Sequence, residues 1–308
     1  MDNKKVAGDA FYNESEKIYS KRSKLELLAY KFLGTIQDAE DAVQETYLRW
    51  YKLTSAEREQ IISPIAWQRT TLTRICFDKL KSAKSKREVY IGEWLPEPAS
   101  QIENLGSTTE QHESVDPADQ LILAHSVSMA LMIVLDKMTP AERVSFILHD
   151  VFQYSFEEIS EIVGRTPQAC RQLASSGRKR INQKKHFPSS QKEHAQVNAA
   201  FRIAWLTGNI QELVTILDER VNAITDGGGF VSASVTPLFG RNAVIDFFLS
   251  AFTRQNDLQI EEVFVNGEPG LVGKAAGRTI SVISTCVRDG RICDIWVMRN
   301  PEKLTDWH

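Results

Sequence analysis

The stretch from Tyr154 to Ile181 constrains this chain most, because its capping and turn residues predict two short helices joined by a tight turn. Ser155 and Glu158 have the spacing of a capping box, which predicts the start of the first helix. Gly164 ends that helix, since glycine accepts the left-handed conformation of a tight turn. Thr166, followed by proline, is the expected N-cap of the second helix. This pattern is typical of a helix-turn-helix.

The second helix divides into a narrow seam and a polar, basic face. Small or apolar residues form the seam toward the first helix: Cys170, Ala174, Gly177 and Ile181. The opposite face carries cations suited to phosphates and amides suited to base edges: Gln168, Arg171, Gln172, Ser175, Arg178 and Lys179. Residues 165–185 hold seven Lys or Arg and no acidic residue. An amphipathic helix pair with a solvated basic face is the alternative on shape alone, and the charge favours DNA binding.

Length and composition limit the number of domains and the classes of protein to which this chain can belong. A chain of 308 residues with 42% hydrophobic residues accommodates two or three globular domains. The net charge of −3 conceals separate basic blocks and an acidic connector. No segment approaches the roughly 18 apolar residues of a membrane span, and the N-terminus lacks the apolar part of a signal peptide. We therefore expect a cytoplasmic protein without a membrane partner.

Three helices are expected before residue 90, and the first covers residues 14–33, has an apolar stripe and ends at Gly34. Residues 37–52 begin with acids and carry aromatic residues at helical spacing, which fits either a capped surface helix or a protein-docking helix. Residues 63–87 form a basic helix that begins at a Ser-Pro pair. Its cations, hydroxyls and indole suit a DNA backbone and an unstacked base: Trp67, Arg69, Thr70, Arg74, Lys79 and Lys81. For Trp67 alone, a core position is the more common alternative.

After residue 92 the amino-acid composition changes, and after residue 188 the predicted secondary structure changes. Residues 93–116 hold six acids and no Lys or Arg, and their Pro, Ser, Thr and Gly content predicts a linker whose first residues pack against a surface. A helix over 119–137 then precedes a second capping box at Thr139 and Glu142. After residue 188, helices over 193–206, 210–217 and 242–253 accompany several strands. They predict an α+β domain with a curved antiparallel sheet.

The cysteines give no metal-binding motif. Cys286 and Cys293 flank a hairpin turn at Asp289-Gly290, so we expect them to face each other as a hydrogen-bonded pair, reduced and packed. A zinc site is not expected, because no His lies nearby. The same register places Asp294 on a face with four apolar residues: Ile283, Val287, Ile292 and Trp296.

Two basic helical blocks joined by an acidic linker resemble an extracytoplasmic-function RNA polymerase sigma factor. Residues 38–50 are similar to region 2.2, which docks on the clamp helices of core RNA polymerase, and residues 63–87 resemble regions 2.3 and 2.4, which open and read the −10 element. Residues 139–181 are similar to region 4, which reads the −35 element. The resemblance implies that core polymerase is contacted by Asp38, Asp41, Glu45 and Arg49. It assigns the −10 element to the six residues of the basic helix and the −35 element to the outward face of the second helix.

The rest of the chain resembles the cone-shaped, SnoaL-like (NTF2-like) domain fused to one subgroup of these factors. Residues 94–98 match its WLPEP linker motif, 226–229 match most of its DGGGK motif, and 300–304 are close to its NPDKL motif. Phe230 stands where that motif has Lys, and Gly177 stands where region 4 usually has Ala, which weakens a helix by up to about 1 kcal/mol. Regulatory contacts are implied for Trp94, Leu95, Pro96, Glu97, Pro98, Asp226, Gly227, Gly228, Gly229, Asn300 and Pro301.

The expected organisation is multidomain: an all-α region 2 (1–92), the linker (93–118), an all-α region 4 (119–187) and the α+β domain (190–308). The resemblance implies a sigma factor that binds polymerase clamp and flap and both promoter elements. Its C-terminal domain regulates it in cis, in place of a separate anti-sigma factor. No catalytic residue, cofactor or metal is expected.

Two alternatives remain at this point. The C-terminal domain is either a small-molecule sensor or an enzyme attached to a DNA-binding regulator, with Asp294 and Trp296 marking its pocket. Alternatively, the chain is an ordinary transcriptional regulator that does not dock on polymerase.

Overall fold

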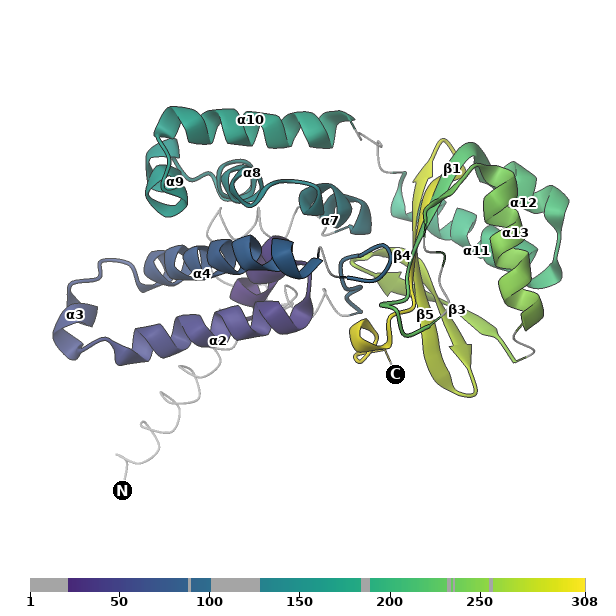
Figure 1. The fold of residues 1–308 in the computed structure, drawn as a ribbon, viewed down its shortest axis with the longest axis horizontal. Coiled ribbons are helices and arrows are strands. Elements are labelled where there is room, and N and C mark those ends of the chain that lie inside the picture. Colours follow the sequence, from purple (N-terminus) through teal and green to yellow (C-terminus); the bar gives the residue numbers. More distant parts are fainter. Residues whose placement is uncertain are drawn as a thin grey trace, which may run out of the picture. The chain divides into compact units, whose positions relative to one another are not determined.

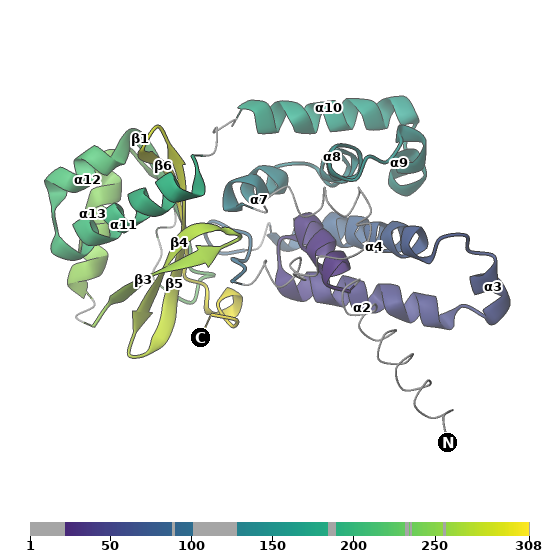
Figure 2. The ribbon, with the colours of Figure 1, turned by 180° about the vertical axis from the view of Figure 1, so that it is seen from behind.

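The chain folds into two compact units in a computed structural model, which describes residues 22–87, 90–100, 128–183, 189–231, 234, 236–254 and 257–307. In the described part, the first unit comprises 22–82 and 138–177, and the second comprises 83–100, 128–137 and 178–307. Figures 1 and 2 show the elements from opposite sides. The predictions for residues 1–21 and 101–127, which include most of the acidic linker, lie outside the described residues.

From residue 22 on, the described part of the first unit starts with helices that pack on one another. A helix over 22–33 ends at Gly34, whose φ is +80°, and α2 (Ile36–Lys52) follows. The short α3 (Ser55–Glu59) leads to α4 (Pro64–Arg87). The helices expected over 37–52 and 63–87 are therefore confirmed. Apolar side chains at helical spacing bury the helices against one another: Leu28, Phe32, Val43, Leu72, Cys76 and Leu80.

The helix-turn-helix is present as predicted. The unit continues with α8 (Pro140–Phe146), the π-helical turn η1 (Ile147–Val151), α9 (Phe156–Val163) and α10 (Pro167–Gln183). Reciprocal hydrogen bonds form both capping boxes, Thr139 with Glu142 and Ser155 with Glu158. Gly164 adopts φ +68° between α9 and α10. Because these signals are local in the sequence, they fixed the helix boundaries without tertiary information.

The seam of α10 is buried at Cys170, Ala174 and Gly177 and half-buried at Ile181, and at Gly177 it packs on α8 and not on α9, the helix expected from the sequence. Cys170 and Ala174 are fully buried on that seam. A Cβ added at Gly177 would lie 2.9 Å from the Cβ of Phe146 on α8, closer than real Cβ contacts. The glycine therefore permits the close approach of α10 to α8, in addition to the helix-weakening effect expected from the sequence.

The second unit is α+β. Its sheet contains β1 (Leu217–Asp226), β2 (Leu238–Phe239), β3 (Gln259–Val265), β4 (Glu268–Ala275), β5 (Arg278–Arg288) and β6 (Arg291–Met298), in the order β2-β1-β6-β5-β4-β3. Figures 1 and 2 show the helices that cover one side of this sheet. They are α11 (Gln191–Thr207), α12 (Ile210–Ile216) and α13 (Arg241–Arg254). The unit also contains α7 (Met129–Asp136) and the 3-10 helix η2 (Pro301–Lys303).

The expectation of a purely antiparallel sheet was wrong at one place. Strands β3 to β6 form successive antiparallel hairpins, whereas β1 pairs with β6 in parallel. In the chain, β1 is separated from β6 by β2, α13 and strands β3 to β5, and a connection of this length permits parallel pairing where a tight turn does not.

The two faces of the sheet bury different partners. The inner face packs against α11–α13, with Phe201, Trp205, Phe248, Ile283, Val287 and Ile292 in that core. The opposite face carries a second buried cluster, here called the outer-face cluster. It consists of Leu95, Met129, Ile133, Val265, Val272, Val282, Cys286, Cys293, Trp296, Met298, Leu304 and Trp307. Residues from the linker, α7 and the C-terminal segment therefore complete the core of the α+β domain.

A β-bulge near the end of the β5–β6 hairpin corrects the predicted register. Cys286 pairs with Asp294 and Val287 pairs with Ile292, which leaves Cys293 as the extra residue. Cys286 and Cys293 are therefore not the directly opposed pair expected from a regular hairpin. Asp294 consequently lies on the outer face with Trp296, and its predicted grouping with Ile283, Val287 and Ile292 was wrong.

Candidate functional site

The residues predicted to contact the −35 element lie on one face of α10. Gln168, Arg171, Gln172 and Lys179 are exposed, and Ser175 and Arg178 are half-buried. The guanidinium of Arg171 lies 5.1 Å from the centre of the Phe156 ring, a cation–π contact that holds it at the surface. The helix-turn-helix therefore presents its polar, basic side away from the buried seam.

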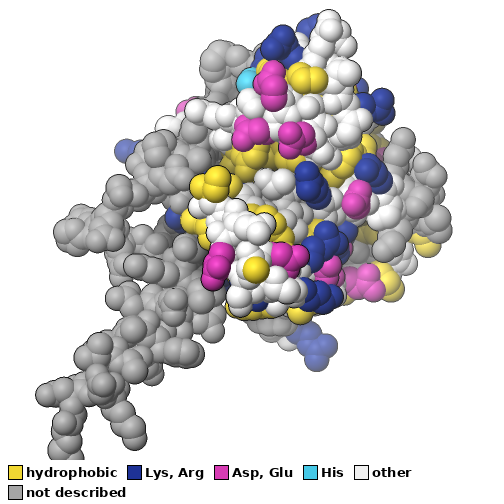
Figure 3. Space-filling view, turned by 90° about the vertical axis from the view of Figure 1, so that its left-hand side faces the viewer, with side chains coloured by type: hydrophobic (Ala, Val, Ile, Leu, Met, Phe, Trp, Pro, Cys, Tyr) yellow, Lys and Arg dark blue, Asp and Glu magenta, His cyan; other side chains and the backbone are white. Residues whose placement is uncertain are grey.

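Helices α2 and α4 bring two predicted sites together. Lys79 Nζ lies 3.3 Å from Asp38 Oδ1 and 3.5 Å from Asp41 Oδ2, which joins a predicted DNA contact to two predicted polymerase contacts. Arg49 pairs with Glu45 along α2 at 2.8 Å. Basic and acidic side chains are likewise interspersed on the face of the molecule in Figure 3. Exposed pairs of this kind contribute little to stability, so a charged partner can compete for them.

Other predicted −10 residues make contacts inside the first unit. Trp67 is half-buried, and its ring lies 5.2 Å from that of Trp50 in an edge-on arrangement. The hydroxyl of Thr70 hydrogen-bonds the side chain of Tyr154, and burial is the main cause of the raised pKa of that tyrosine. Of the remaining members, Arg69 and Lys79 are half-buried and Arg74 and Lys81 are exposed.

A buried contact between α8 and the helix over 22–33 was not predicted from the sequence. Arg143 is buried and donates from Nη2 to the carbonyl oxygen of Lys31 at 3.1 Å. Burial lowers the pKa of Lys31 to about 8. Lys31 and Arg143 do not follow the hydrophobic periodicity of the sequence, so only their burial in the structure identifies them.

Asp226 is the centre of the predicted regulatory contacts. It ends β1 with none of its side chain exposed, and Lys303 Nζ lies 2.8 Å from its Oδ2. The same oxygen accepts from the backbone N–H of Leu95 at 2.9 Å. Oδ1 accepts from the hydroxyl of Tyr90 at 2.6 Å and from the N–H of Gly228 at 3.0 Å. One carboxylate therefore joins the linker, the glycine loop and the C-terminal segment.

Two glycines of the loop, Gly228 and Gly229, are needed for close contacts. Gly228 has φ +62°, and a Cβ there would lie 2.5 Å from the amide of Asn300. Gly229 has φ +78° and faces Ile91, two residues before the linker. Asn300 in turn donates from Nδ2 to the Tyr90 hydroxyl at 2.9 Å. A plain turn would not require this packing on both sides.

Further contacts fix the rest of the linker head. Lys303 donates to the carbonyl of Leu95 at 2.7 Å and places its ammonium 4.3 Å from the centre of the Trp94 ring. Ala99 exchanges both backbone hydrogen bonds with Asn266, whose side chain accepts at 2.8 Å and whose N–H donates at 2.9 Å. Trp307 Nε1 donates to the carbonyl of Pro98 at 3.0 Å. Pro96, Glu97 and Pro98 are buried, and Pro301 is exposed.

Sequence reasoning missed the residues that complete this site: Tyr90, Asn266, Lys303 and Trp307. Lys303 lies within residues 300–304, which were matched to a motif. The presence of a lysine in one motif and of Asp226 in another was the available signal for an ion pair between them. Tyr90 and Asn266 lie outside every motif, so only the tertiary structure identifies them.

Asp294 and Trp296, predicted to mark a pocket, lie on the face of the sheet opposite to three of the four apolar residues expected beside Asp294. Both residues lie on the outer face, where the linker and α7 cover the sheet. On the inner face, His194 Nε2 and the Thr285 hydroxyl lie 2.8 Å apart, and that hydroxyl donates to Asn198 Oδ1 at 2.7 Å. Burial lowers the pKa of His194 to about 4, so it is neutral at physiological pH. These polar groups link α11 to the sheet.

Comparisons with known proteins match both helical blocks and most of the chain. Family models for Sigma-70 region 2 and Sigma-70 region 4 match residues 20–86 and 128–181. The ECF RNA polymerase sigma factor SigJ of Mycobacterium tuberculosis (strain H37Rv) is 34% identical over 302 residues, covering 92% of this chain and 91% of that protein. The probable ECF sigma factor SigI of the same organism is 30% identical and covers 90% of each chain.

The similarity extends to the three-dimensional structure. The crystal structure of the M. tuberculosis extracytoplasmic function sigma factor SigJ superposes with a TM-score of 0.73 at 30% identity, covering 94% of this chain and 98% of that one. The match therefore includes the α+β domain as well as regions 2 and 4. Among the described helices, none has the length and apolar character needed to cross a bilayer. The chain belongs to the extracytoplasmic function RNA polymerase sigma factors, non-enzymatic proteins of transcription initiation.

Proposed function

We propose that this sigma factor is regulated in cis by its α+β domain, which holds the linker between regions 2 and 4 through Asp226. The observation that carries this proposal is the convergence of Asp226 and Lys303 on the backbone of Leu95. Removing one partner of a buried ion pair costs roughly 3–5 kcal/mol, because the other charge is left buried and unpaired, so loss of either partner should release the linker. No separate anti-sigma factor is needed for such a restraint.

The first helix of region 4 is held by the same domain. The region 4 match begins at residue 128, and α7 follows directly. Met129 and Ile133 of α7 are buried in the outer-face cluster together with Leu95. A domain that holds both the linker and α7 limits the positions that region 4 can adopt along promoter DNA. This restraint determines how readily region 2 and region 4 bind the −10 and −35 elements at the same time.

The remaining sites follow the sequence-based assignment. Region 2 engages the clamp helices of core RNA polymerase through α2 and the −10 element through α4. Region 4 contacts the polymerase flap and reads the −35 duplex with α10, whose outward residues are exposed or half-buried. The ion pairs of Lys79 with Asp38 and Asp41 are exchanged for partner contacts on binding.

Run-off transcription with core RNA polymerase tests this proposal. The full chain is compared with a chain truncated near Phe187, one truncated near Arg299, and the full-length Asp226→Ala variant. We expect activity in all four, with the three altered chains differing from wild type in the same direction. Glu219→Ala, an exposed acid on the same strand, is the control and should leave transcription unchanged.

Two results would contradict the proposal at different points. Wild-type transcription by a folded Asp226→Ala variant would show that the carboxylate has no regulatory function. Failure of every chain to bind core polymerase would instead remove the sigma assignment of α2, and the interpretation as an ordinary DNA-binding regulator would return.

A further inference from the structure

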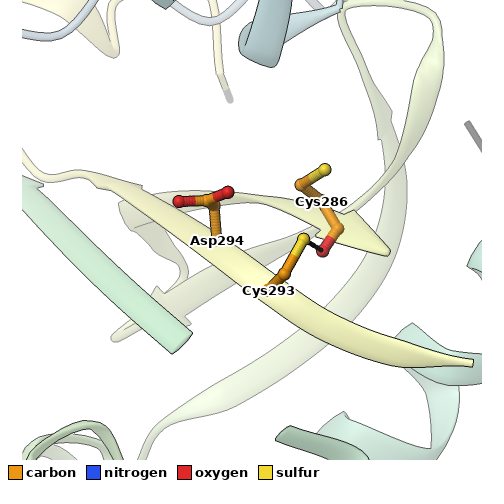
Figure 4. Close-up of side chains that lie close together, drawn as sticks. All are labelled: Cys286, Cys293 and Asp294. Carbon is orange, nitrogen blue, oxygen red and sulfur yellow. Dashed lines mark hydrogen bonds between the residues drawn. The ribbon is translucent and has the colours of Figure 1, made fainter. Parts of the chain in front are cut away.

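The hairpin of β5 and β6 places three metal-binding side chains together on the outer face of the sheet. Cys286 belongs to β5, and Cys293 and Asp294 belong to β6. Their two sulfur atoms and a carboxylate oxygen all lie within 4.8 Å of one another (Figure 4). We propose that these residues form a binding site for a thiophilic divalent cation of the Zn²⁺ class.

The bulge is the reason that the three side chains converge. In a regular strand, consecutive side chains point to opposite faces, so Cys293 and Asp294 would be separated by the sheet. Because Cys293 is the extra residue of the bulge, both side chains lie beside Cys286 on the same face. The thiol of Cys293 donates a hydrogen bond to the carbonyl oxygen of Cys286 at 3.2 Å, which holds the bulged residue in this position.

The donor set selects the class of cation. Two thiolates and one carboxylate suit Zn²⁺ and similar thiophilic ions, whereas Mg²⁺ and Ca²⁺ prefer oxygen ligands alone. Two sulfur atoms bound to one Zn²⁺ at about 2.3 Å lie about 3.8 Å apart, so small side-chain rotations from the present separations suffice. Three protein ligands leave a fourth tetrahedral position for water. The absence of a nearby His, which argued against zinc in the sequence, is compensated by Asp294.

The surroundings support an ordered site. Asn222 on β1 pairs with Asp294 in the sheet, and its Nδ2 donates to Asp294 Oδ1 at 3.4 Å. Partners of this kind orient a metal-binding carboxylate. The two cysteines are only 8% and 5% exposed, whereas Asp294 is half-buried. A cation therefore enters from the carboxylate side and is then enclosed by apolar residues.

The position of the site suggests what the cation changes. Cys286 and Cys293 pack in the same cluster as Met129 and Ile133 of α7 and Leu95 of the linker. A cation bound there alters the surface that holds both segments. This consequence rests on the proposed regulation in cis, whereas binding of the cation does not depend on it.

Cobalt(II) binding to the reduced full-length protein tests the site, with a phosphine as the reductant. Thiolate ligands give an intense charge-transfer absorption in the near ultraviolet, and Zn²⁺ should displace the cobalt. We expect one equivalent of Co²⁺ with this absorption. Cys286→Ala and Cys293→Ala should abolish the absorption, and Asp294→Asn should weaken binding at least about tenfold.

The other two cysteines provide matched controls. Cys76 in α4 and Cys170 in α10 are also buried, and their alanine variants should bind Co²⁺ as the wild type does. Circular dichroism melting identifies any variant that fails to fold. If both cysteine variants fail, the half-buried Asp294→Asn variant decides the outcome. The proposal is overturned if Co²⁺ gives no thiolate absorption with the wild type, or if folded variants of the site bind with unchanged affinity.

Run-off transcription with and without Zn²⁺ separates binding from regulation. A zinc-dependent change in the wild type that is lost in Asp294→Asn supports the coupling to α7 and the linker. If cobalt binds but Zn²⁺ does not change transcription, the proposed coupling of the site to α7 and the linker is wrong. The regulation through Asp226 is tested separately by the Asp226→Ala variant.

Discussion

Lys303 Nζ lies 2.8 Å from Asp226 Oδ2, and both residues contact the backbone of Leu95. The two partners are 77 residues apart in the sequence, and their side chains are 10% and 0% exposed. A buried carboxylate needs a counter-charge and hydrogen-bond donors, and here the linker supplies one of the donors. The ion pair and the docked linker therefore depend on each other.

Removing the counter-charge should release the linker head. In Lys303→Met, the buried Asp226 carboxylate loses its cation, and we expect a loss of stability of roughly 3–5 kcal/mol in the α+β domain. Hydrogen exchange at the Leu95 amide should accelerate, because this N–H is bonded to Asp226. The Ala99 amide, bonded to Asn266, is the internal control. The double variant Asp226→Asn with Lys303→Met should recover part of the lost stability; equal protection of Leu95 in all forms would contradict this account.

The buried His194 and the half-buried Glu268 should give the α+β domain opposite pH dependences. Burial lowers the pKa of His194 from 6.5 to about 4, so the unfolded chain binds the extra proton and stability falls as the pH drops from 6.5 to 4. Burial raises the pKa of Glu268 from 4.5 to about 7, so the folded chain binds the extra proton and stability rises as the pH drops from 7 to 4.5. The two effects are each worth roughly 3 kcal/mol and nearly cancel.

Single substitutions should separate these effects. In His194→Gln, the Glu268 effect remains, and the domain should become more stable between pH 7 and pH 5. In Glu268→Gln, the His194 effect remains, and the domain should become less stable over the same range. Urea unfolding of the full chain at both pH values measures this, and parallel pH dependences in the two variants would disprove the assignment.

Gly177→Ala should destabilise region 4 although alanine is the better helix former. Alanine gains up to about 1 kcal/mol of helix propensity. The added Cβ would lie 2.9 Å from Phe146 Cβ, and overpacking of this kind costs roughly 1–3 kcal/mol. Gln172→Ala, on the exposed face of the same helix, should leave stability unchanged or slightly higher. Denaturant unfolding decides between the two effects, and a stabilised Gly177→Ala would mean that α8 and α10 separate easily.

Arg171→Ala combined with Arg178→Ala should abolish specific binding to the −35 element. Each lost bidentate base contact is worth about 1–3 kcal/mol, so the loss of both corresponds to roughly 30-fold or more in affinity. The salt dependence of binding should also decrease. Arg202→Ala on α11, which removes an arginine paired with Glu262 in the α+β domain, is the control. Unchanged promoter affinity at fixed salt would refute the assignment of α10 as the recognition helix.

Local sequence signals determined the helical part of this protein. The capping boxes at Thr139 and Ser155, the left-handed Gly164 and the seam of α10 were all predictable, because each depends on residues three or four positions apart. The motifs in the linker and around Asp226 also indicated that these segments make contacts. Their spacing did not show which atoms meet.

Only the tertiary structure decided the relationships between distant segments. The parallel pairing of β1 with β6, the bulge at Cys293 and the ion pair of Asp226 with Lys303 bring together residues that no local periodicity connects. A bulge shifts the register by one residue and moves a side chain to the opposite face, so the hairpin pattern alone placed Asp294 incorrectly. Helix signals are local because helix hydrogen bonds are local. Sheet register and buried charge pairs are properties of the whole fold.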